Sequence, residues 1–165
     1  MRKLIVSAIV VFTILGLLLA KPQAKIGYKA PEFKLQSLTD NTSVSLSGLK
    51  GKVVLVDFWA SWCGPCKISM PHLAQLSQKY KNFKLVAVNI DDDKNNAIKF
   101  LNELNLDITA VFDSSKKVIS AYDVPVMPTA YLVDQYGNVQ YIHSGTSEDS
   151  FKKLEFAIRG LVDHP

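Results

Sequence analysis

One run of seven residues, Val53–Trp59, limits most strongly how this chain can fold. Its residues, VVLVDFW, are mostly β-branched or aromatic, and they follow one another without regular polar alternation. Gly51 comes before the run and a cysteine-containing loop comes after it. A strand of this kind is buried on both faces, as in sheets that helices cover on both sides. We therefore expect Val53–Trp59 to be a central strand of an α/β domain.

Beyond this strand the chain alternates between helical and extended patterns. Apolar residues recur at helical spacing from the cysteine loop to Tyr80, and Pro71 is expected to kink this helix. A second buried strand follows at 83–90. Thr146, with Asp149 three residues later, resembles a capping box and predicts the start of the last helix. The remaining elements are expected to be a helix at 95–104, a strand at 110–112, a helix at 118–122, strands at 129–133 and 139–143, and a final helix to Leu161.

A short hairpin is expected before the central strand. Apolar and polar residues alternate between Phe33 and Leu46, on both sides of a turn at Thr39–Asn41. Strands that alternate with helices, together with hairpins, predict a mixed sheet between layers of helices. In such sheets the chemistry usually lies where a strand leads into a helix, which here is the cysteine loop.

An apolar segment, Leu4–Ala20, precedes the domain. It holds 17 residues without a charge. As a helix it would span about 26 Å, slightly less than a bilayer core of about 30 Å. Arg2 and Lys3 favour an N-terminus that stays in the cytoplasm, which places the following domain outside. We expect residues 1–24 to be a signal peptide or an N-terminal membrane anchor, and Leu18, a poor residue for a cleavage site, favours the anchor.

The composition indicates a folded domain without a nucleic-acid partner. Hydrophobic residues make up 48% and charged residues 21% of the 165 residues, which is enough apolar surface for a core. The formal net charge is +4, but three of the 19 basic residues flank the apolar segment and the other 16 nearly balance the 15 acidic residues. No basic stripe is left to follow a phosphate backbone. The run Asp91–Asp93 lacks the spacing of a calcium loop and is interpreted as a solvated loop.

The chain has only two cysteines, Cys63 and Cys66. A disulfide across two residues restricts the unfolded chain very little, so the pair is a poor structural staple. A zinc site needs four ligands, and the sequence offers no second cysteine pair and no paired histidines, so we expect no metal site. Reactivity is the remaining interpretation of the pair.

The residues around the pair suit a reactive thiol. The N-terminus of a helix stabilises a thiolate, and Cys63 is expected to occupy this position. Gly64 permits a close approach of another chain, and Pro65 is tolerated in a first helical turn. Cys66, three residues on, shares a helical face with Cys63, so the two sulfurs can bond.

A carboxyl group interrupts the central strand. Asp57 lies on the same strand face as Leu55 and Trp59, where burial without a partner is costly and raises the pKa of a carboxyl. Such a group can exchange protons with a thiol, although a solvated Asp at the end of the strand is the alternative. Trp59 is expected in the core, and Trp62 at a rim that meets a partner.

These residues resemble a known family. The segment Val54–Lys67 is similar to the active-site segment of thioredoxins almost residue for residue. Lys29–Phe33, Leu49–Lys52 and an additional helix and strand between Asp91 and Pro128 resemble the membrane-tethered TlpA/ResA-like branch. The resemblance covers roughly residues 27–161. It implies a thioredoxin fold for a single domain at 25–165, with an N-terminal β-hairpin and a central helix–strand insertion.

The resemblance also implies roles for individual residues. Asp57 matches the buried acid that exchanges protons with the second cysteine, while Ala87 stands where the family has a lysine and Ser69 where the ResA-like group tends to have a glutamate. Met127-Pro128-Thr129 matches a loop with a cis-proline that lies against the cysteines and leaves backbone free to pair with a substrate. The residues expected to contact the substrate are Trp62, Gly64, Pro65, Met127, Pro128 and Thr129.

The resulting functional hypothesis is thiol–disulfide exchange. The Cys63 thiolate attacks a partner disulfide, and Cys66, deprotonated by Asp57, resolves the mixed disulfide. The resemblance implies a reductant, because Gly64-Pro65 separates the cysteines, and no cofactor other than this redox-active disulfide. We expect a monomer that acts on disulfide-containing proteins outside the cytoplasm, with apocytochrome c as one example, and that receives electrons from a membrane donor.

Three other functions compete with this hypothesis. A thiol peroxidase is one, because the Ala30–Phe33 entry also occurs in peroxiredoxins, although their reactive cysteine is not in a CGPC motif. A copper-handling module that uses Cys63, Cys66 and His143 is another. A pure interaction protein would have no use for two exchanging cysteines. Apart from the copper hypothesis, His72 and His143 match nothing catalytic and are interpreted as surface or edge residues.

Overall fold

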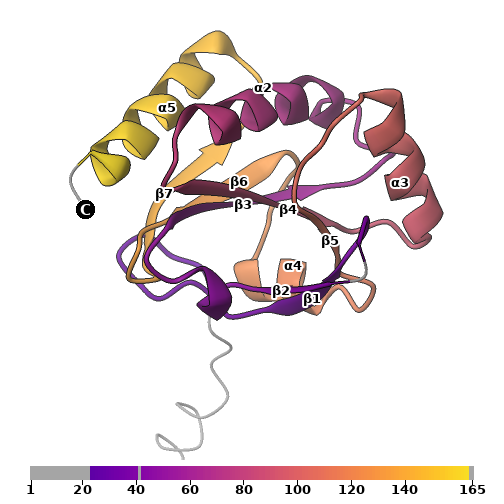
Figure 1. The fold of residues 1–165 in the computed structure, drawn as a ribbon, viewed down its shortest axis with the longest axis horizontal. Coiled ribbons are helices and arrows are strands. Elements are labelled where there is room, and N and C mark those ends of the chain that lie inside the picture. Colours follow the sequence, from indigo (N-terminus) through magenta and orange to yellow (C-terminus); the bar gives the residue numbers. More distant parts are fainter. Residues whose placement is uncertain (1–22, 41, 164–165) are drawn as a thin grey trace, which may run out of the picture.

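The computed structural model describes residues 23–40 and 42–163. They form one mixed sheet of seven strands in the order β2-β1-β5-β4-β3-β6-β7, with helices on both sides (Figure 1). The strands are β1 (Lys34–Ser37), β2 (Ser43–Ser45), β3 (Val53–Trp59), β4 (Phe83–Asn89), β5 (Ala110–Phe112), β6 (Thr129–Val133) and β7 (Val139–Ser144). The helices are η1 (Ser47–Leu49), α2 (Cys66–Lys79), α3 (Lys94–Glu103), α4 (Lys117–Tyr122) and α5 (Glu148–Val162).

Strand β3 occupies the centre of the sheet, as its sequence predicts. It pairs in parallel with β4 and antiparallel with β6, and all of its residues are buried. The expected hairpin forms from β1 and β2, with Leu35 opposite Val44. The α/β architecture with an N-terminal hairpin and a helix–strand insertion is therefore confirmed.

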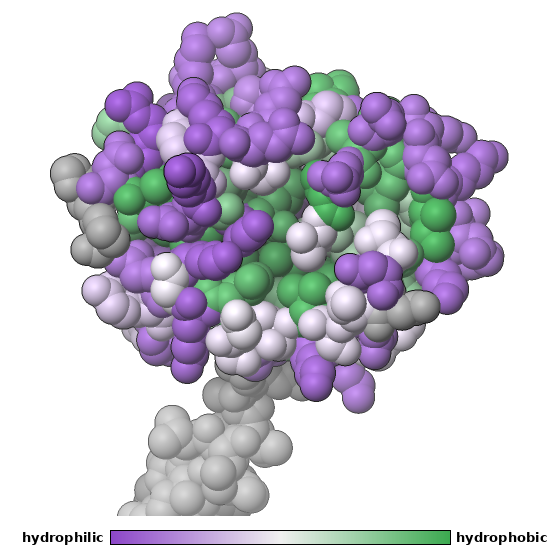
Figure 2. Space-filling view, in the orientation of Figure 1, coloured by the Kyte–Doolittle hydropathy of each residue, from purple (hydrophilic) through white to green (hydrophobic). Residues whose placement is uncertain are grey.

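The side chains of β3 divide between two faces of the sheet. Leu55 and Trp59, with Asp57 between them, point to the side that α2, α3 and α5 cover, which we call the α2 face. Val54, Val56 and Phe58 point to the opposite side, over α4, which we call the α4 face. Figure 1 shows α2 and α5 above the sheet and α4 below it. Figure 2 shows hydrophobic side chains toward the middle of the molecule and hydrophilic ones around its rim.

The last helix begins one residue later than the capping-box prediction places it. The N-cap of α5 is Ser147, whose side chain accepts a hydrogen bond from the backbone N–H of Ser150 at 3.2 Å. The prediction with Thr146 as cap was therefore wrong. Strand β7 runs on to Ser144 and Gly145 follows with a φ of 85°, so the chain turns into the helix too late for Thr146 to cap it.

Most of the expected targeting segment, residues 1–22, lies outside the described residues. The described part begins at Gln23, and Ala24 already packs into the core of the α4 face. Within 23–40 and 42–163, none of the helices combines the length and the apolar character needed to cross a bilayer.

Candidate active site

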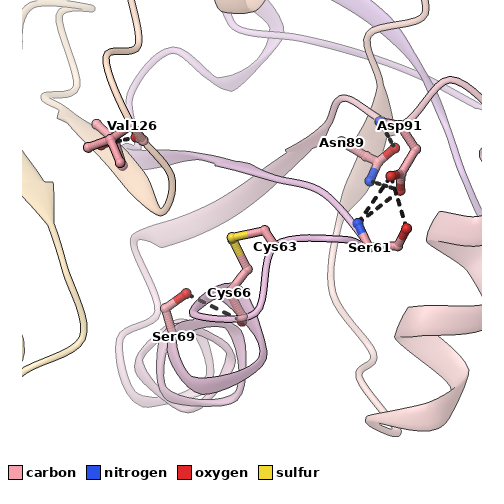
Figure 3. Close-up of a disulfide and its surroundings, with 8 residues drawn as sticks. Ser61, Cys63, Cys66, Ser69, Asn89, Asp91 and Val126 are labelled. Carbon is pink, nitrogen blue, oxygen red and sulfur yellow. Dashed lines mark hydrogen bonds between the residues drawn. A yellow bond between two sulfur atoms is a disulfide. The ribbon is translucent and has the colours of Figure 1, made fainter.

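A disulfide joins Cys63 and Cys66 where β3 leads into α2 (Figure 3). The helix begins at Cys66 with Pro65 as its N-cap, so Cys63 lies just before the helix and not in its first turn. Tight turns explain this difference from the sequence-based expectation. The N–H of Cys63 donates to the Ala60 carbonyl and the N–H of Cys66 donates to the Cys63 carbonyl, both at 3.1 Å. Cys63 therefore still stands at the N-terminal end of α2, three residues before its first residue.

The two sulfur-bearing residues differ in access to solvent. Cys63 is 6% exposed, whereas Cys66 is fully buried. Trp62, next to Cys63, is 66% exposed. A partner can therefore approach Cys63 along a surface that includes an aromatic side chain, while Cys66 is shielded.

Asp57 is buried on the α2 face, in the middle of β3. It is 1% exposed, and neither carboxyl oxygen makes a hydrogen bond to any residue that the structure describes. Burial raises the pKa of Asp57 well above its usual value, because a charged carboxylate is poorly solvated there. The alternative of a solvated Asp57 was therefore wrong. Ala87 lies opposite Asp57 on β4 and Ala130 opposite it on β6.

The loop before β6 carries a cis peptide bond between Met127 and Pro128. Met127 packs against the cluster that contains both cysteines, as the resemblance implies for this loop. The Thr129 hydroxyl donates to the Val126 carbonyl at 2.7 Å and closes the loop, and Val126 itself is exposed. Figure 3 shows Val126 on one side of the disulfide and Ser61 on the other.

A hydrogen-bond network that the sequence interpretation missed holds the loop before Cys63. The buried Asp91 carboxylate accepts from the Ser61 N–H at 3.1 Å, the Ser61 hydroxyl at 2.9 Å and the Asn89 side-chain amide at 2.9 Å (Figure 3). The interpretation of Asp91 as part of a solvated loop was therefore wrong. A signal was present in the sequence, because parallel strands end at the same edge of a sheet, which brings Asn89, the last residue of β4, and Asp91 close to the end of β3.

Ser69 stands one helical turn after Cys66 and is fully buried. Its hydroxyl donates to the Cys66 carbonyl at 3.4 Å. At this position the chain therefore offers a neutral hydroxyl and no carboxyl to the interior beside the cysteines.

The two histidines near the α2 face are less exposed than typical surface residues, although His143 is an edge residue as expected. His143 does lie on the edge strand β7, but its side chain is only 2% exposed, and His72 is half-buried. Both imidazoles stack on the ring of Phe151, with ring centroids 5.4 Å and 4.0 Å away. In the part of the chain that the structure describes, no three His, Cys, Asp or Glu side chains are grouped so that they could hold a metal ion, so the copper hypothesis gains no support.

The arrangement suits a dithiol that exchanges with an external disulfide. Cys63 is the more exposed sulfur-bearing residue, Cys66 is bonded to it, and Asp57 is a buried carboxyl on the same side of the sheet. Exchange requires a thiolate that attacks and a second thiol that releases the product. The site provides both from its two cysteines.

Comparisons with known proteins agree with this chemistry. The Redoxin family model matches residues 25–158. The thiol-disulfide oxidoreductase ResA of Bacillus subtilis (strain 168) is 36% identical over 129 residues, which cover 75% of this chain and 70% of the relative. Two solved structures are also similar. A thiol:disulfide interchange protein DsbE from Chlorobium tepidum has a TM-score of 0.79 at 39% identity, covering 84% of this chain and 99% of that one. The thioredoxin domain of a thiol-disulfide oxidoreductase from Bacteroides vulgatus has a TM-score of 0.72 at 28% identity, covering 81% and 98%.

Proposed function

This chain belongs to the Redoxin family and is a ResA-like thiol-disulfide oxidoreductase of the thioredoxin superfamily, and from this premise we propose that it reduces the disulfides of partner proteins outside the cytoplasm. The observation that carries the proposal is the setting of the bonded pair: Cys63 keeps 6% exposure beside the exposed Trp62, whereas Cys66 is fully buried. Only the accessible sulfur of the reduced pair can attack a protein-sized disulfide.

The reaction proceeds in two exchanges. The Cys63 thiolate attacks one sulfur of the partner disulfide, forms a mixed disulfide and releases the other partner sulfur as a thiolate, which takes a proton from solvent. Cys66 then passes its proton to the Asp57 carboxylate and attacks the Cys63 sulfur. The second partner sulfur leaves as a thiolate, so the partner gains two electrons and the Cys63–Cys66 disulfide forms.

The partner is expected to bind over the exposed side of the site. Trp62 provides an apolar contact beside Cys63, and Gly64 and Pro65 leave room for a close approach. Met127, next to the cis-proline Pro128, packs against the cysteine cluster, and its backbone is proposed to pair with an extended partner segment. Thr129 supports this loop through its bond to the Val126 carbonyl.

Direction and location rest on the sequence. Gly64-Pro65 between the cysteines is the spacer of reducing thioredoxins, and the apolar segment after Arg2-Lys3 directs the domain out of the cytoplasm. A reductant in an oxidising compartment needs electrons from a membrane donor. Apocytochrome c and other envelope proteins with disulfides are the proposed substrates.

A thiol-coupled disulfide reduction assay tests the proposal. The wild-type protein is expected to reduce a protein disulfide with turnover, Cys63→Ser to be inactive, and Cys66→Ser to accumulate a mixed disulfide. Equilibration with a glutathione or dithiothreitol couple gives the reduction potential, which is expected to be strongly reducing. A protein that fails to reduce disulfides but rapidly oxidises dithiols would be an oxidase, and the proposed direction would be wrong.

A further inference from the structure

The three parallel strands at the centre of the sheet end at the same edge, and polar side chains join the loops that follow them. Strand β4 pairs in parallel with β3 on one side and with β5 on the other, so their carboxyl ends lie side by side. The loop after β3 leads to the disulfide, the loop after β4 carries Asp91, and the loop after β5 carries Lys116. Contacts between these loops can therefore act on the exchange site.

Asp91 binds the loop that leads to the disulfide. Its carboxylate is buried, and the Ser61 N–H donates to its two oxygens at 3.1 and 3.2 Å. The Ser61 hydroxyl and the Asn89 side-chain amide each donate to it at 2.9 Å (Figure 3). Hydrogen bonds to a buried carboxylate are among the stronger ones in a protein, because their loss would leave a charge without solvation. Asp91 therefore fixes the backbone of Ser61, two residues before Cys63.

Lys116 holds the loop that carries Asp91. Its Nζ donates to the carbonyls of Ile90 at 2.5 Å and Asp91 at 2.6 Å, and lies 3.3 Å from the Asp92 carboxylate. The backbone of Lys116 has a φ of 58°, which is uncommon for a residue other than glycine and is kept where the surrounding contacts fix it. Within residues 23–40 and 42–163, none of the hydrogen bonds or ion pairs of its side chain reaches the cysteine loop. These bonds therefore connect Lys116 to the cysteines only by way of Asp91.

We propose that Asp91, itself held by Lys116, is a positioning residue that keeps the turn before Cys63 in the conformation of the disulfide. This makes the protein a stronger reductant, so the inference deepens the proposed reducing function and rests on it. None of the bonds in the network involves a sulfur atom, so reduction of the disulfide breaks none of them.

The physical reason is the entropy that is lost when the disulfide closes. In the dithiol, a turn that is free to move lets the Cys63 sulfur move away from Cys66, and this freedom is lost when the bond forms. A turn that is already held in the bonded conformation loses less, which favours the disulfide over the dithiol. A protein whose disulfide is favoured gives up its electrons more readily and is therefore more reducing.

A fixed charge on Asp91 would act in the same direction without any positioning. Ser61 and Cys63 are two residues apart, so the Asp91 carboxylate lies within roughly 10 Å of the Cys63 backbone, where a negative charge disfavours a thiolate. The charge of Lys116 has the opposite sign. By charge alone, its removal disfavours the Cys63 thiolate and makes the protein more reducing. By positioning, its removal frees the loop that carries Asp91 and makes the protein less reducing.

Equilibration of the full-length protein with glutathione tests the inference. The protein disulfide and two glutathione thiols give the protein dithiol and one oxidised glutathione, and alkylation traps the two protein forms. Asp91→Asn keeps the shape of the side chain but removes its charge and one acceptor oxygen. It is expected to shift this equilibrium about tenfold towards the dithiol, the order expected when the backbone of one residue loses its restraint, which makes the potential about 30 mV more positive.

Lys116→Met separates positioning from charge. Methionine keeps a long side chain but removes the charge and the bonds to the carbonyls of Ile90 and Asp91. The equilibrium is expected to shift about threefold towards the dithiol, the net contribution of a typical hydrogen bond. Because Lys116 acts through Asp91, the double variant is expected to shift the equilibrium no further than Asp91→Asn alone.

Asp113→Asn is the matched control. Asp113 is another buried carboxylate, directly after β5, and it accepts hydrogen bonds from the N–H groups of Val118 and Ile119 at 2.9 and 3.0 Å. Its substitution is expected to lower the free energy of unfolding, as Asp91→Asn does, because each removes the charge of a buried, hydrogen-bonded carboxylate. The glutathione equilibrium of Asp113→Asn is expected to stay within about twofold of the wild type, because distant sites act independently.

Three results would overturn the inference. They are an unchanged equilibrium in Asp91→Asn, an equal shift in Asp113→Asn, and a shift of Lys116→Met towards the disulfide, which would indicate an effect of charge alone. Lys116→Met, at a partly exposed position, decides the question if Asp91→Asn does not fold. A wild-type protein that equilibrates as an oxidant, while both variants still shift towards the dithiol, would refute the proposed direction of exchange and not the role of Asp91.

Discussion

The two faces of the central strand are buried to the same extent, but they hold different kinds of side chain. On the α4 face, Val56 and Phe58 pack into an apolar cluster, and the Phe58 ring centroid lies 5.1 Å from that of Tyr122. On the α2 face, Asp57 stands between Leu55 and Trp59 in the same strand, below the helix that begins at Cys66. Residues that alternate along β3 thus lie in two different environments, one entirely apolar and one that contains a carboxyl.

This contrast shows how one strand can support both stability and chemistry. Apolar burial on the α4 face is favourable and leaves no polar group unpaired on the strand. The carboxyl on the α2 face costs stability, and the same lack of solvation raises its affinity for a proton on the face of the sheet that also carries the cysteines. Substitutions on each face are therefore expected to separate folding from activity.

The largest expected effect on activity comes from the accessible cysteine. Cys63→Ser should reduce the rate of protein disulfide reduction to that of the uncatalysed reaction, because a hydroxyl does not form the mixed disulfide. Its thermal unfolding should change little, since a disulfide across two residues restricts the unfolded chain weakly. A Cys63→Ser protein that still turns over in the thiol-coupled assay would contradict the assignment of the nucleophile.

The largest expected effect on stability comes from the α4 face. Phe58→Ala should lower the free energy of unfolding by about 3–5 kcal/mol, because a fully buried aromatic ring leaves a cavity. The exchange rate per folded molecule should stay close to that of the wild type. Urea denaturation gives the first value, and activity normalised to the folded fraction gives the second. A proportionate loss of both would show that the two faces are not separable.

Asp57→Asn, on the α2 face, is expected to change the exchange rate, which Phe58→Ala leaves close to that of the wild type. Exchange at neutral pH should slow by about 100-fold through loss of the proton acceptor. Because the pKa of Asp57 is raised in the folded protein, the native state binds more protons than the unfolded state. Its contribution to stability is therefore complete below about pH 4 and is lost as pH rises through the folded value. Unfolding measured from pH 4 to 9 should show this decline in the wild type and not in Asp57→Asn, and identical pH profiles would refute the raised pKa.

A smaller effect is expected at the loop before Cys63. Ser61→Ala removes the hydroxyl that donates to the buried Asp91 carboxylate and should lower the free energy of unfolding by about 1–2 kcal/mol. The remaining bond from the Ser61 N–H should keep the loop in place, so the exchange rate should fall only a few-fold. Ser77→Ala, which removes a partly buried serine hydroxyl bonded within α2, is a matched control that should leave exchange unchanged. Equal effects of the two variants would argue against a special role for Asp91.

The sequence predicted the elements better than it predicted how polar groups are arranged within them. The run Val53–Trp59 and the helical spacing after Cys66 depend on local patterns of apolar residues, and both elements lie where those patterns place them. The start of α5 was missed by one residue, because two adjacent hydroxyl residues can each cap a helix and the end of β7 decides between them. Asp91 was missed because its partners come from a different strand end.

Those site features that depend only on residues close together in the chain could thus be predicted from the sequence. Cys63 and Cys66 are three residues apart, so their ability to bond needs little more than the turn between them, and Asp57 was identified because it interrupts an apolar strand. The tertiary structure alone decided that His143 is buried on the same face of the sheet as Asp57, since that placement depends on the order and register of β3, β6 and β7. Strand register is set by the packing of whole faces, which no short segment of sequence contains.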